Sequence, residues 1–378
     1  MKKCVIIPDS FKGSMDSIEI CSLAKEKVLE FFPACEVITL PVADGGEGTV
    51  ECFLQAMEGG ERITASVSGP YREPVESFYG RFGDMAVVEM AAAAGLPMVE
   101  DRKNPAVTTT YGVGELIAHA LDNGAKRIVL GMGGSCTNDG GCGCAAALGV
   151  KFTDAQGNEF VPVGETLGRI AGIDLSAAQQ KLRGVEIVAM CDVENPMHGE
   201  TGAAYIFGPQ KGADEAMVKE LDNQLKALDQ IIQSSLGIPS VAPMQGAGAA
   251  GALGAGVVAF LGAELKSGIE TVLDVIGFEN RIEGADAVFT GEGKIDSQSL
   301  KGKVVIGVSK RTMRKGTPLF AIVGDVGDGV EGAYDMGVTA IFSINRVAVP
   351  FSEARKRSKR DFSAAFGDIM RLIKAMGK

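Results

Sequence analysis

The sequence predicts an α/β protein built from a discontinuous Rossmann-like parallel-sheet domain and a second α/β domain inserted into it. Near both ends of the chain, short apolar strands alternate with helical patterns, which indicates a parallel sheet covered on both faces. Between these regions lie closely spaced strands of alternating polarity, which is typical of antiparallel pairing. The 378 residues include 51 glycines, in keeping with many strand-to-helix turns, and are enough for two cores.

The discontinuous domain is expected to begin with a strand at Val5–Ile7, a helix at Ile18–Phe32 and a second strand at Val37–Leu40. Ser14 or Ser17 is the expected cap of that helix, and the proline after it ends the helical pattern. The last third of the chain repeats this rhythm. Its expected strands are Ala287–Thr290, Leu319–Val323 and Ala340–Ile344.

The inserted domain is expected to open with antiparallel strands, followed by strands and helices around the chain's longest glycine-rich loop. We place its edges near residues 67 and 284, each within about ten residues. The active site is expected in the cleft between the two domains. The antiparallel strands are expected at 63–67, 75–82 and 86–89, and the domains at 1–66 with 285–378 and at 67–284.

Composition excludes several classes of partner. The formal net charge is −11, which disfavours nucleic acid and anionic membrane surfaces. No window approaches the roughly 18 apolar residues of a membrane span, and the first apolar run is too short for a signal peptide. Eight cysteines without a staple-like pattern suggest a reducing compartment, so we expect a cytoplasmic protein. A homodimer is one of the oligomeric states that the sequence leaves open.

Six loops that are glycine-rich or charged border expected strands, where open α/β sheets bind ligands. Any one of them is also explained as a plain turn. Together, with only two histidines in the chain, they favour phosphoryl transfer over hydrolysis by a Ser-His pair. The loops are Pro8–Ser14, Pro41–Gly48, Gly131–Cys144, Cys191–Pro196, Phe207–Gly212 and Thr290–Ser297.

These loops give the chain a family resemblance. The segments PDSFKGS, PVADGGEGT, GGSCTNDGG, CDVENP, FGPQKGA and TGEGKIDSQS, in this order, resemble the bacterial type of the glycerate kinase family. The resemblance implies phosphorylation of D-glycerate with ATP and Mg²⁺, with 2-phosphoglycerate as the product. It also implies the discontinuous Rossmann-like architecture inferred above. Two departures are visible: Cys136 stands where the family commonly has alanine, and Met197–Glu200 replaces a more usual leucine-containing turn.

The candidate site residues follow from what phosphoryl transfer needs: alignment, neutralised charge and a proton acceptor. Asp192 is the expected acceptor, with a helix or turn cap as its alternative role. Asp139 and Asp296 are the expected Mg²⁺ carboxylates, with Asp44 as a substitute. Lysines are expected to neutralise phosphoryl or carboxylate charge, and the other candidates to bind substrate or phosphate. The lysines are Lys12, Lys211 and Lys294, and the others are Asp9, Ser10, Gly133, Gly134, Ser135, Thr137, Asn138 and Asn195.

Other functions stay open at this point. The sequence does not distinguish 3-phosphoglycerate from 2-phosphoglycerate as the product, and a non-catalytic sensor of sugar acids on the same fold is a further alternative. Cys136, Cys142 and Cys144 raise the idea of a zinc or thiol site, but they lack paired C-x2-C spacing. The segment Gly246–Gly251 satisfies G-x-G-x-x-G, yet no convincing strand precedes it, so we interpret it as a close-packed start of a helix.

Overall fold

The computed structural model describes residues 1–43 and 45–377, which form two compact units with separate cores. Both units combine sheets with helices, so the predicted α/β class is confirmed. Unit 1 is made of Met1–Asp44, Glu51–Glu58 and Ile269–Lys378, and unit 2 of Gly45–Val50 and Gly59–Gly268. The domain boundaries expected near residues 67 and 284 stay predictions.

Unit 1 is built on a five-stranded sheet in which all strands are parallel. The strand order is β16-β14-β12-β1-β2, so the N-terminal strand lies inside the sheet. Counted along the chain, the five strands lie in the order 2-1-3-4-5, which is a common order of doubly wound sheets. The strands are β1 (Lys3–Pro8), β2 (Glu36–Thr39), β12 (Ala287–Gly291), β14 (Leu319–Val323) and β16 (Val338–Ser343); β13 (Lys294–Ile295) pairs separately with β15 (Asp325–Val326).

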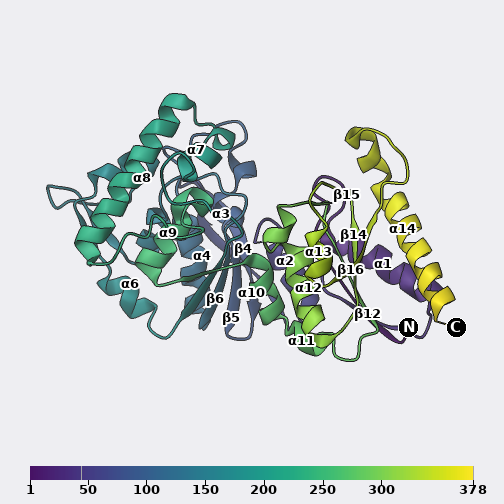
Figure 1. Ribbon diagram of the computed structural model, residues 1–378. Coiled ribbons are helices and arrows are strands. Elements are labelled where there is room, and N and C mark those ends of the chain that lie inside the picture. The colour runs from purple at the N-terminus through teal and green to yellow at the C-terminus, as the bar shows by residue number, and fades with distance from the viewer. Residues whose placement is uncertain (44, 378) are drawn as a thin grey trace. The chain divides into compact units, whose positions relative to one another are not determined.

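Helices cover both faces of this sheet, as Figure 1 shows for α1 and α14 on one side and α12 and α13 on the other. The first helix begins at Ser17, and the carboxylate of Asp16 accepts the amide of Glu19. The cap is therefore Asp16, and the expectation of Ser14 or Ser17 was wrong. The helices are α1 (Ser17–Phe31), α2 (Thr49–Ala56), α10 (Gly268–Val275), α11 (Phe278–Arg281), α12 (Val304–Lys315), α13 (Gly332–Asp335) and α14 (Phe351–Met376), with the 3-10 turn η4 (Ser299–Lys301).

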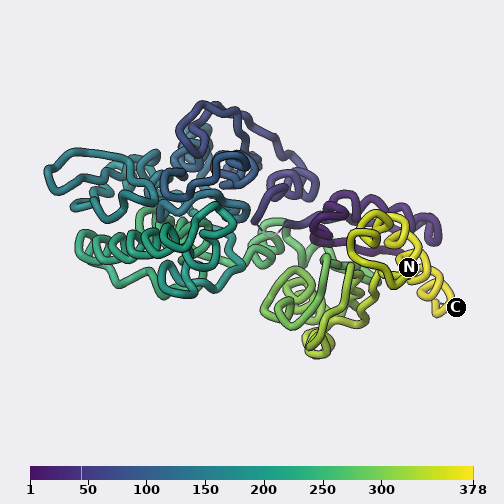
Figure 2. The backbone as a smooth tube through the Cα atoms, turned by 90° about the horizontal axis from the view of Figure 1, so that it is seen from above, coloured from purple at the N-terminus to yellow at the C-terminus, as the bar shows by residue number. Residues whose placement is uncertain are grey.

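The core of unit 1 joins the two ends of the chain. Helices α1 and α14 pack on each other, and Figure 2 shows the purple N-terminal and yellow C-terminal segments side by side. Phe362 and Phe366 of α14 stack at 5.6 Å between ring centroids, and Phe366 meets the β12 ring of Phe289 at 5.1 Å. These aromatic contacts fix the C-terminal helix on the centre of the sheet.

Unit 2 contains a six-stranded mixed sheet of order β11-β10-β6-β5-β4-β3. The β3–β4 and β4–β5 pairs are antiparallel, which confirms the expectation from alternating polarity, whereas β5, β6, β10 and β11 pair in parallel. The strands are β3 (Glu61–Ser68), β4 (Pro74–Phe82), β5 (Met85–Glu89), β6 (Arg127–Gly131), β10 (Glu186–Met190) and β11 (Glu264–Lys266); a small sheet has the order β8 (Glu159–Phe160), β7 (Lys151–Thr153), β9 (Gly172–Asp174).

The helices of unit 2 surround a large apolar core. Helix α8 begins at Glu215 with Asp214 as its cap, and its buried face carries Val218, Leu221 and Leu225. The helices are α3 (Ala91–Ala94), α4 (Tyr111–Asp122), α5 (Cys142–Ala147), α6 (Ser176–Lys181), α7 (Ala203–Phe207), α8 (Glu215–Leu236) and α9 (Ala249–Leu261), with the 3-10 turns η1 (Leu96–Val99), η2 (Gly164–Arg169) and η3 (Pro209–Lys211).

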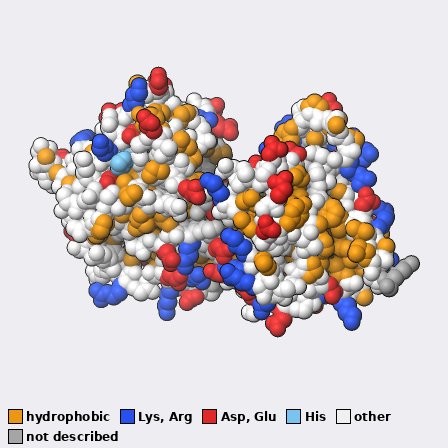
Figure 3. All heavy atoms as spheres, in the orientation of Figure 1, with side chains coloured by type: hydrophobic (Ala, Val, Ile, Leu, Met, Phe, Trp, Pro, Cys, Tyr) orange, Lys and Arg blue, Asp and Glu red, His pale blue; other side chains and the backbone are white. Residues whose placement is uncertain are grey.

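The surface is of the kind that the composition predicts. On the face drawn in Figure 3, acidic and basic side chains are interspersed. Within residues 1–43 and 45–377, no helix is long and apolar enough to cross a bilayer.

Candidate active site

The sheet order of unit 1 marks one edge as a ligand site. Strands β1 and β12 are neighbours, and from them the sheet continues in opposite directions, toward β2 and toward β14. In open α/β sheets, ligands bind outside the carboxyl ends of the strands at such a switch point. The loops that leave β1 and β12 at this edge are two of the six loops singled out in the sequence. This part of the site is therefore positioned by topology.

The loop after β1 carries three of the predicted site residues. Asp9 is buried and accepts the amide of Ser10 at 2.6 Å, while Lys12 is exposed. Phe11 is buried between them, and its amide donates to the Met15 carbonyl at 2.8 Å. The buried ring anchors the loop, so that the polar residues on either side of it stay at the edge of the sheet.

The loop after β12 carries the predicted residues Lys294 and Asp296. Their side chains lie 3.6 Å apart, and the Asp296 carboxylate also accepts the amide of Gln298 at 2.9 Å. This backbone hydrogen bond is the main cause that lowers the pKa of Asp296. A half-exposed, ionised carboxylate fits a magnesium ligand.

Glu292, in the same loop, is a residue that sequence reasoning missed. Its side chain is only 5% exposed, and its Oε1 has no hydrogen-bond partner among the described residues. Burial raises the pKa of Glu292 to about 7. The signal available in the sequence was its place directly after an apolar strand, in the segment that also holds Lys294 and Asp296.

In unit 2, the glycines at the start of the Gly131 loop serve close packing. A Cβ on Gly133 would lie 2.6 Å from the Cα of Gly46, and the Gly133 amide donates to the Gly45 carbonyl at 2.9 Å. The Gly133 N–H, which we expected to bind phosphate, is therefore already used. Gly134 is exposed and adopts φ +75°, which glycine tolerates best.

The centre of this loop is organised by Lys211. Its ammonium donates to the Ser135 hydroxyl and to the Thr137 carbonyl, both at 2.7 Å. Lys211 is 2% exposed, and within the described part of the chain no carboxylate lies within ion-pair distance of it. Burial lowers the pKa of Lys211 to about 8. Lys211, Ser135 and Thr137 therefore lie together, with the buried cation held by neutral oxygens.

The next residues of the loop hold unused polar atoms. The Thr137 hydroxyl and both polar atoms of the Asn138 amide are buried, and none has a hydrogen-bond partner among the described residues. Polar atoms in this state are uncommon in native structures and need an explanation. Their clustering beside Lys211 is consistent with the anion-binding role predicted for this loop.

Asp139, predicted as a magnesium ligand, is enclosed by hydrogen-bond donors of the protein. It is fully buried, and its Oδ2 accepts the amide and hydroxyl of Thr110 at 2.7 and 2.9 Å. The amides of Gly141 and Gly143 also donate to the carboxylate, at 3.1 and 3.2 Å. Burial raises the pKa of Asp139, and these hydrogen bonds counter that effect. A carboxylate so enclosed argues against the metal role that we predicted for it.

Asp192 follows β10 as expected, but it is exposed and its Oδ1 is engaged. It accepts the Ser267 hydroxyl at 3.0 Å and the amide of Gly268, the first residue of α10, at 2.9 Å. This geometry favours the helix cap, which was the alternative role, over the proton acceptor. Asn195, in the same segment, donates to the Thr201 carbonyl at 2.8 Å and so closes the turn locally.

The remaining metal candidate, Asp44, lies outside the described residues. Within residues 1–43 and 45–377, no group of three His, Cys, Asp or Glu side chains is arranged to hold a metal ion. Mg²⁺ does not need such a cage, because it usually takes one or two carboxylates together with phosphate oxygens and water.

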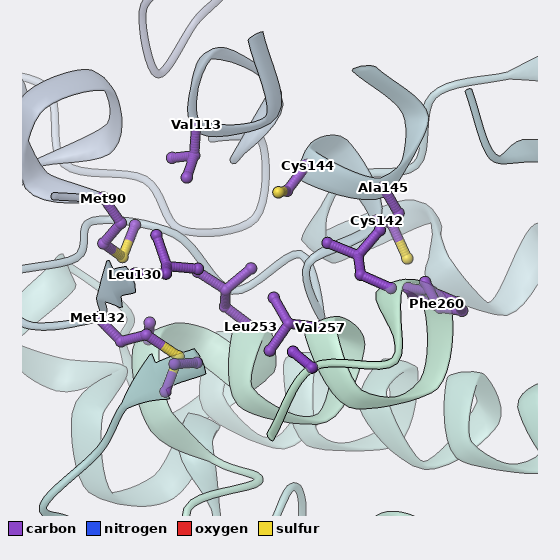
Figure 4. Packing of buried hydrophobic residues seen from close by; sticks show 14 of the residues in the cluster. Met90, Val113, Leu130, Met132, Cys142, Cys144, Ala145, Leu253, Val257 and Phe260 are labelled. Carbon is purple, nitrogen blue, oxygen red and sulfur yellow. The ribbon is translucent and has the colours of Figure 1, made fainter. Parts of the chain in front are cut away.

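The cysteines are part of the core. Cys136, Cys142 and Cys144 are buried and free, and Figure 4 shows the last two among the side chains of Leu253, Val257 and their neighbours. Burial raises the pKa of all three thiols. They are the inert kind of cysteine, which leaves the zinc and thiol alternatives without support.

The glycines of the G-x-G-x-x-G segment allow close backbone packing, in agreement with the interpretation as a close-packed start of a helix. A Cβ on Gly248 would lie 2.2 Å from the Pro196 carbonyl oxygen, and one on Gly251 would lie 2.0 Å from that of Thr137. Ala250, Gly251 and Ala252 all have positive φ, between 55° and 67°, which is uncommon for alanine. This left-handed turn abuts the loop that holds Thr137 and Asn138.

Comparison with known proteins identifies the family. The model of the glycerate kinase family matches residues 4–374. The chain belongs to the glycerate kinase family. A glycerate kinase from Bacillus cereus is 46% identical, with 94% of this chain and 93% of that protein covered. A glycerate 2-kinase from Escherichia coli K12 is also 46% identical, with 90% of each covered.

Solved structures agree with this membership in the glycerate kinase family. A crystal structure of a candidate glycerate kinase 2 from Salmonella typhimurium LT2 superposes with a TM-score of 0.87 at 39% identity. It covers 100% of this chain, and this chain covers 99% of it. The chain is therefore an enzyme of this family, with the discontinuous Rossmann-like unit and the inserted α/β unit described above.

Proposed function

We propose that the enzyme phosphorylates D-glycerate with ATP and Mg²⁺ and that the product is 2-phospho-D-glycerate. The observation that carries the proposal is Lys211, a buried ammonium whose two hydrogen bonds go to uncharged oxygens. Such a cation gains most when an anionic group binds beside it in a poorly solvated place. The carboxylate of glycerate and a transferred phosphoryl group are both anions of this kind.

The other predicted residues divide into two sets under this proposal. In unit 2, Ser135, Thr137 and Asn138 supply polar groups to the substrate anion. In unit 1, Lys12 and Lys294 neutralise phosphoryl charge at the edge of the sheet, with Asp9 and Ser10 on the same edge.

The residues of unit 1 fit the metal that the reaction needs. Asp296 offers an ionised carboxylate beside Lys294. Asp44, the predicted substitute ligand, lies outside the described residues. When bound with the nucleotide, Mg²⁺ would neutralise charge on the phosphate oxygens. The 2-phosphate assignment rests on the name of the Escherichia coli relative. A cytoplasmic location and a homodimer remain proposals as well.

The test is a coupled assay of ADP release with D-glycerate, ATP and Mg²⁺, with phosphorus NMR of the product. Glycerate-dependent ADP release is the expected result, and the phosphorus spectrum distinguishes the 2-phosphate from the 3-phosphate. Binding of D-glycerate without ADP release would support the sensor instead. Absence of both would exclude D-glycerate as the substrate.

A further inference from the structure

Glu292 occupies the switch point of the unit 1 sheet. Pro8 of β1 is the register partner of Gly291 of β12, so the next residues, Asp9 and Glu292, leave two adjacent parallel strands side by side. The Asp9 amide donates to the Gly291 carbonyl at 2.8 Å, which extends the pairing to this position. The two carboxyl groups therefore emerge at the edge where ligands bind in sheets of this order.

The surroundings of Glu292 leave one of its oxygens without a partner. The Ser299 hydroxyl bonds to the carboxyl group, but Oε1 has no hydrogen bond among the described residues, and the side chain is 5% exposed. A buried carboxylate oxygen without a donor is costly. Both oxygens of the buried Asp139 carboxylate accept hydrogen bonds from the protein, whereas Oε1 of Glu292 accepts none among the described residues. A substrate group that binds during the reaction therefore explains this oxygen better than a purely structural role does.

The charges around Glu292 come from its own loop and from two other segments. Lys303, before α12, favours the ionised form, whereas Asp9 from the loop after β1 and Asp296 from its own loop oppose it. Burial is the largest influence, and together these effects raise the pKa of Glu292 to about 7. A carboxyl group with this pKa changes protonation near neutral pH, as a proton acceptor in catalysis must.

The position next to Lys12 supports a role in the reaction. A Cβ on Gly293 would lie 3.4 Å from the Cα of Phe11 and 3.5 Å from the backbone nitrogen of Lys12. The segment that holds Glu292 thus packs directly on the loop that holds the proposed phosphoryl-neutralising lysine. A proton acceptor and a cation at one edge of the sheet are what transfer of a phosphoryl group to a hydroxyl requires.

We propose that Glu292 is the catalytic residue that accepts the proton of the glycerate hydroxyl, a proposal that rests on the glycerate kinase function proposed above. The hydroxyl O–H bond breaks and its proton passes to Oε1 of Glu292. The electron pair of that hydroxyl oxygen forms the bond to the γ-phosphorus of ATP. The bond between the γ-phosphorus and the oxygen that bridges it to the β-phosphorus breaks, and ADP leaves with the electron pair of this broken bond. Glu292 then returns the proton to water.

The test compares Glu292→Gln with the wild-type enzyme and with Glu331→Gln, an exposed carboxyl group of the same unit. Glu292→Gln should lower kcat by at least about a hundredfold, while the Kd values of ATP and D-glycerate stay within a few-fold of wild type. In the wild type, kcat/KM should fall below pH 7 with a single ionisation, and Glu331→Gln should keep this profile. Formate should partly restore turnover to Glu292→Ala.

The Tm of Glu292→Gln and the activity of the wild type on D-glycerate separate loss of catalysis from loss of folding and from a wrong substrate. Glu292→Gln should have a Tm at pH 8 no lower than that of wild type, because it removes a buried negative charge. Three results would each overturn the proton-acceptor role, provided that the wild type is active. They are full activity of Glu292→Gln, an unchanged fall of kcat/KM at acid pH in that variant, and no rescue of Glu292→Ala by formate. A wild type inactive on D-glycerate would instead overturn the proposed function.

Discussion

At the scale of single residues, Lys211 makes substrate binding depend on pH. Its pKa is lowered to about 8 from 10.5 by burial, so above pH 8 the free enzyme holds a neutral amine. An anion binds better to the ammonium, so affinity for D-glycerate should fall as the pH rises, by up to about tenfold per unit between roughly pH 8 and 10. Calorimetric titration between pH 7 and 9.5 measures this.

The matched variants for this prediction are Lys211→Met and Lys219→Met. Lys219 is an exposed lysine of α8, and its variant should keep the wild-type dependence on pH. Lys211→Met should bind D-glycerate weakly at every pH. Because a lowered lysine pKa disfavours the folded state below about pH 8, the stability of the wild type should rise between roughly pH 8 and 10.5, and that rise should be absent in Lys211→Met.

Asp139 provides a second prediction at this scale. Its carboxylate accepts hydrogen bonds from Thr110, Gly141 and Gly143 in the core of unit 2. Asp139→Asn would turn an N–H₂ group toward these donors and should lower the free energy of unfolding by about 3 kcal/mol or more. Urea unfolding measures the effect, and the exposed Asp122→Asn is the control. A cost below about 1 kcal/mol would show that the carboxylate is not needed there.

Residues are also where sequence reasoning was weakest. The motifs marked loops whose side chains do meet in part, since Lys211 contacts Ser135 and Thr137. They did not separate the roles of the acids. Whether Asp139 is enclosed, Asp192 caps a helix or one oxygen of Glu292 lacks a partner depends on which distant backbone amides and hydroxyls reach each carboxylate. That information comes from tertiary structure and not from local spacing.

At the scale of elements, the left-handed turn at the start of α9 should store strain. Ala252 and Ala255 are both buried alanines of this helix, but only Ala252 has positive φ. Each alanine in that conformation costs about 1 to 2 kcal/mol. Ala252→Gly should therefore destabilise the protein by about 1 to 2 kcal/mol less than Ala255→Gly, as measured by urea unfolding. Equal losses of unfolding free energy in the two variants would mean that the positive φ of Ala252 stores no strain.

Elements were the scale that the sequence predicted best. The alternating polarity of β3 and β4 is a local period of two residues. The continuous apolar runs of β1, β12 and β14 are typical of parallel strands buried on both faces. The helix cap was missed because Asp16, Ser14 and Ser17 are all good capping residues, and the choice depends on which of them is the last extended residue before the helix, here Asp16. The order of strands in either sheet has no such local signal.

At the scale of the whole molecule, unit 2 should fold without unit 1. All six strands of its main sheet and its core cluster lie between Gly45 and Gly268. A fragment of residues 45–268 should therefore show native-like circular dichroism and unfold cooperatively in urea. A fragment of residues 1–58, which contains β1 and β2 but none of their later partners, should be unfolded under the same conditions. Both results are needed for the prediction to hold.

The central place of β1 in its sheet has a consequence for how the protein is made. Its partner β12 lies at Ala287–Gly291, so the ribosome adds all of unit 2 before that partner exists. At about 5 to 20 residues per second, the apolar first strand waits roughly a quarter of a minute to one minute with one edge unpaired. Nascent chains of intermediate length should therefore expose that edge to chaperones, and unit 2 should already be folded when unit 1 closes around its own first strand.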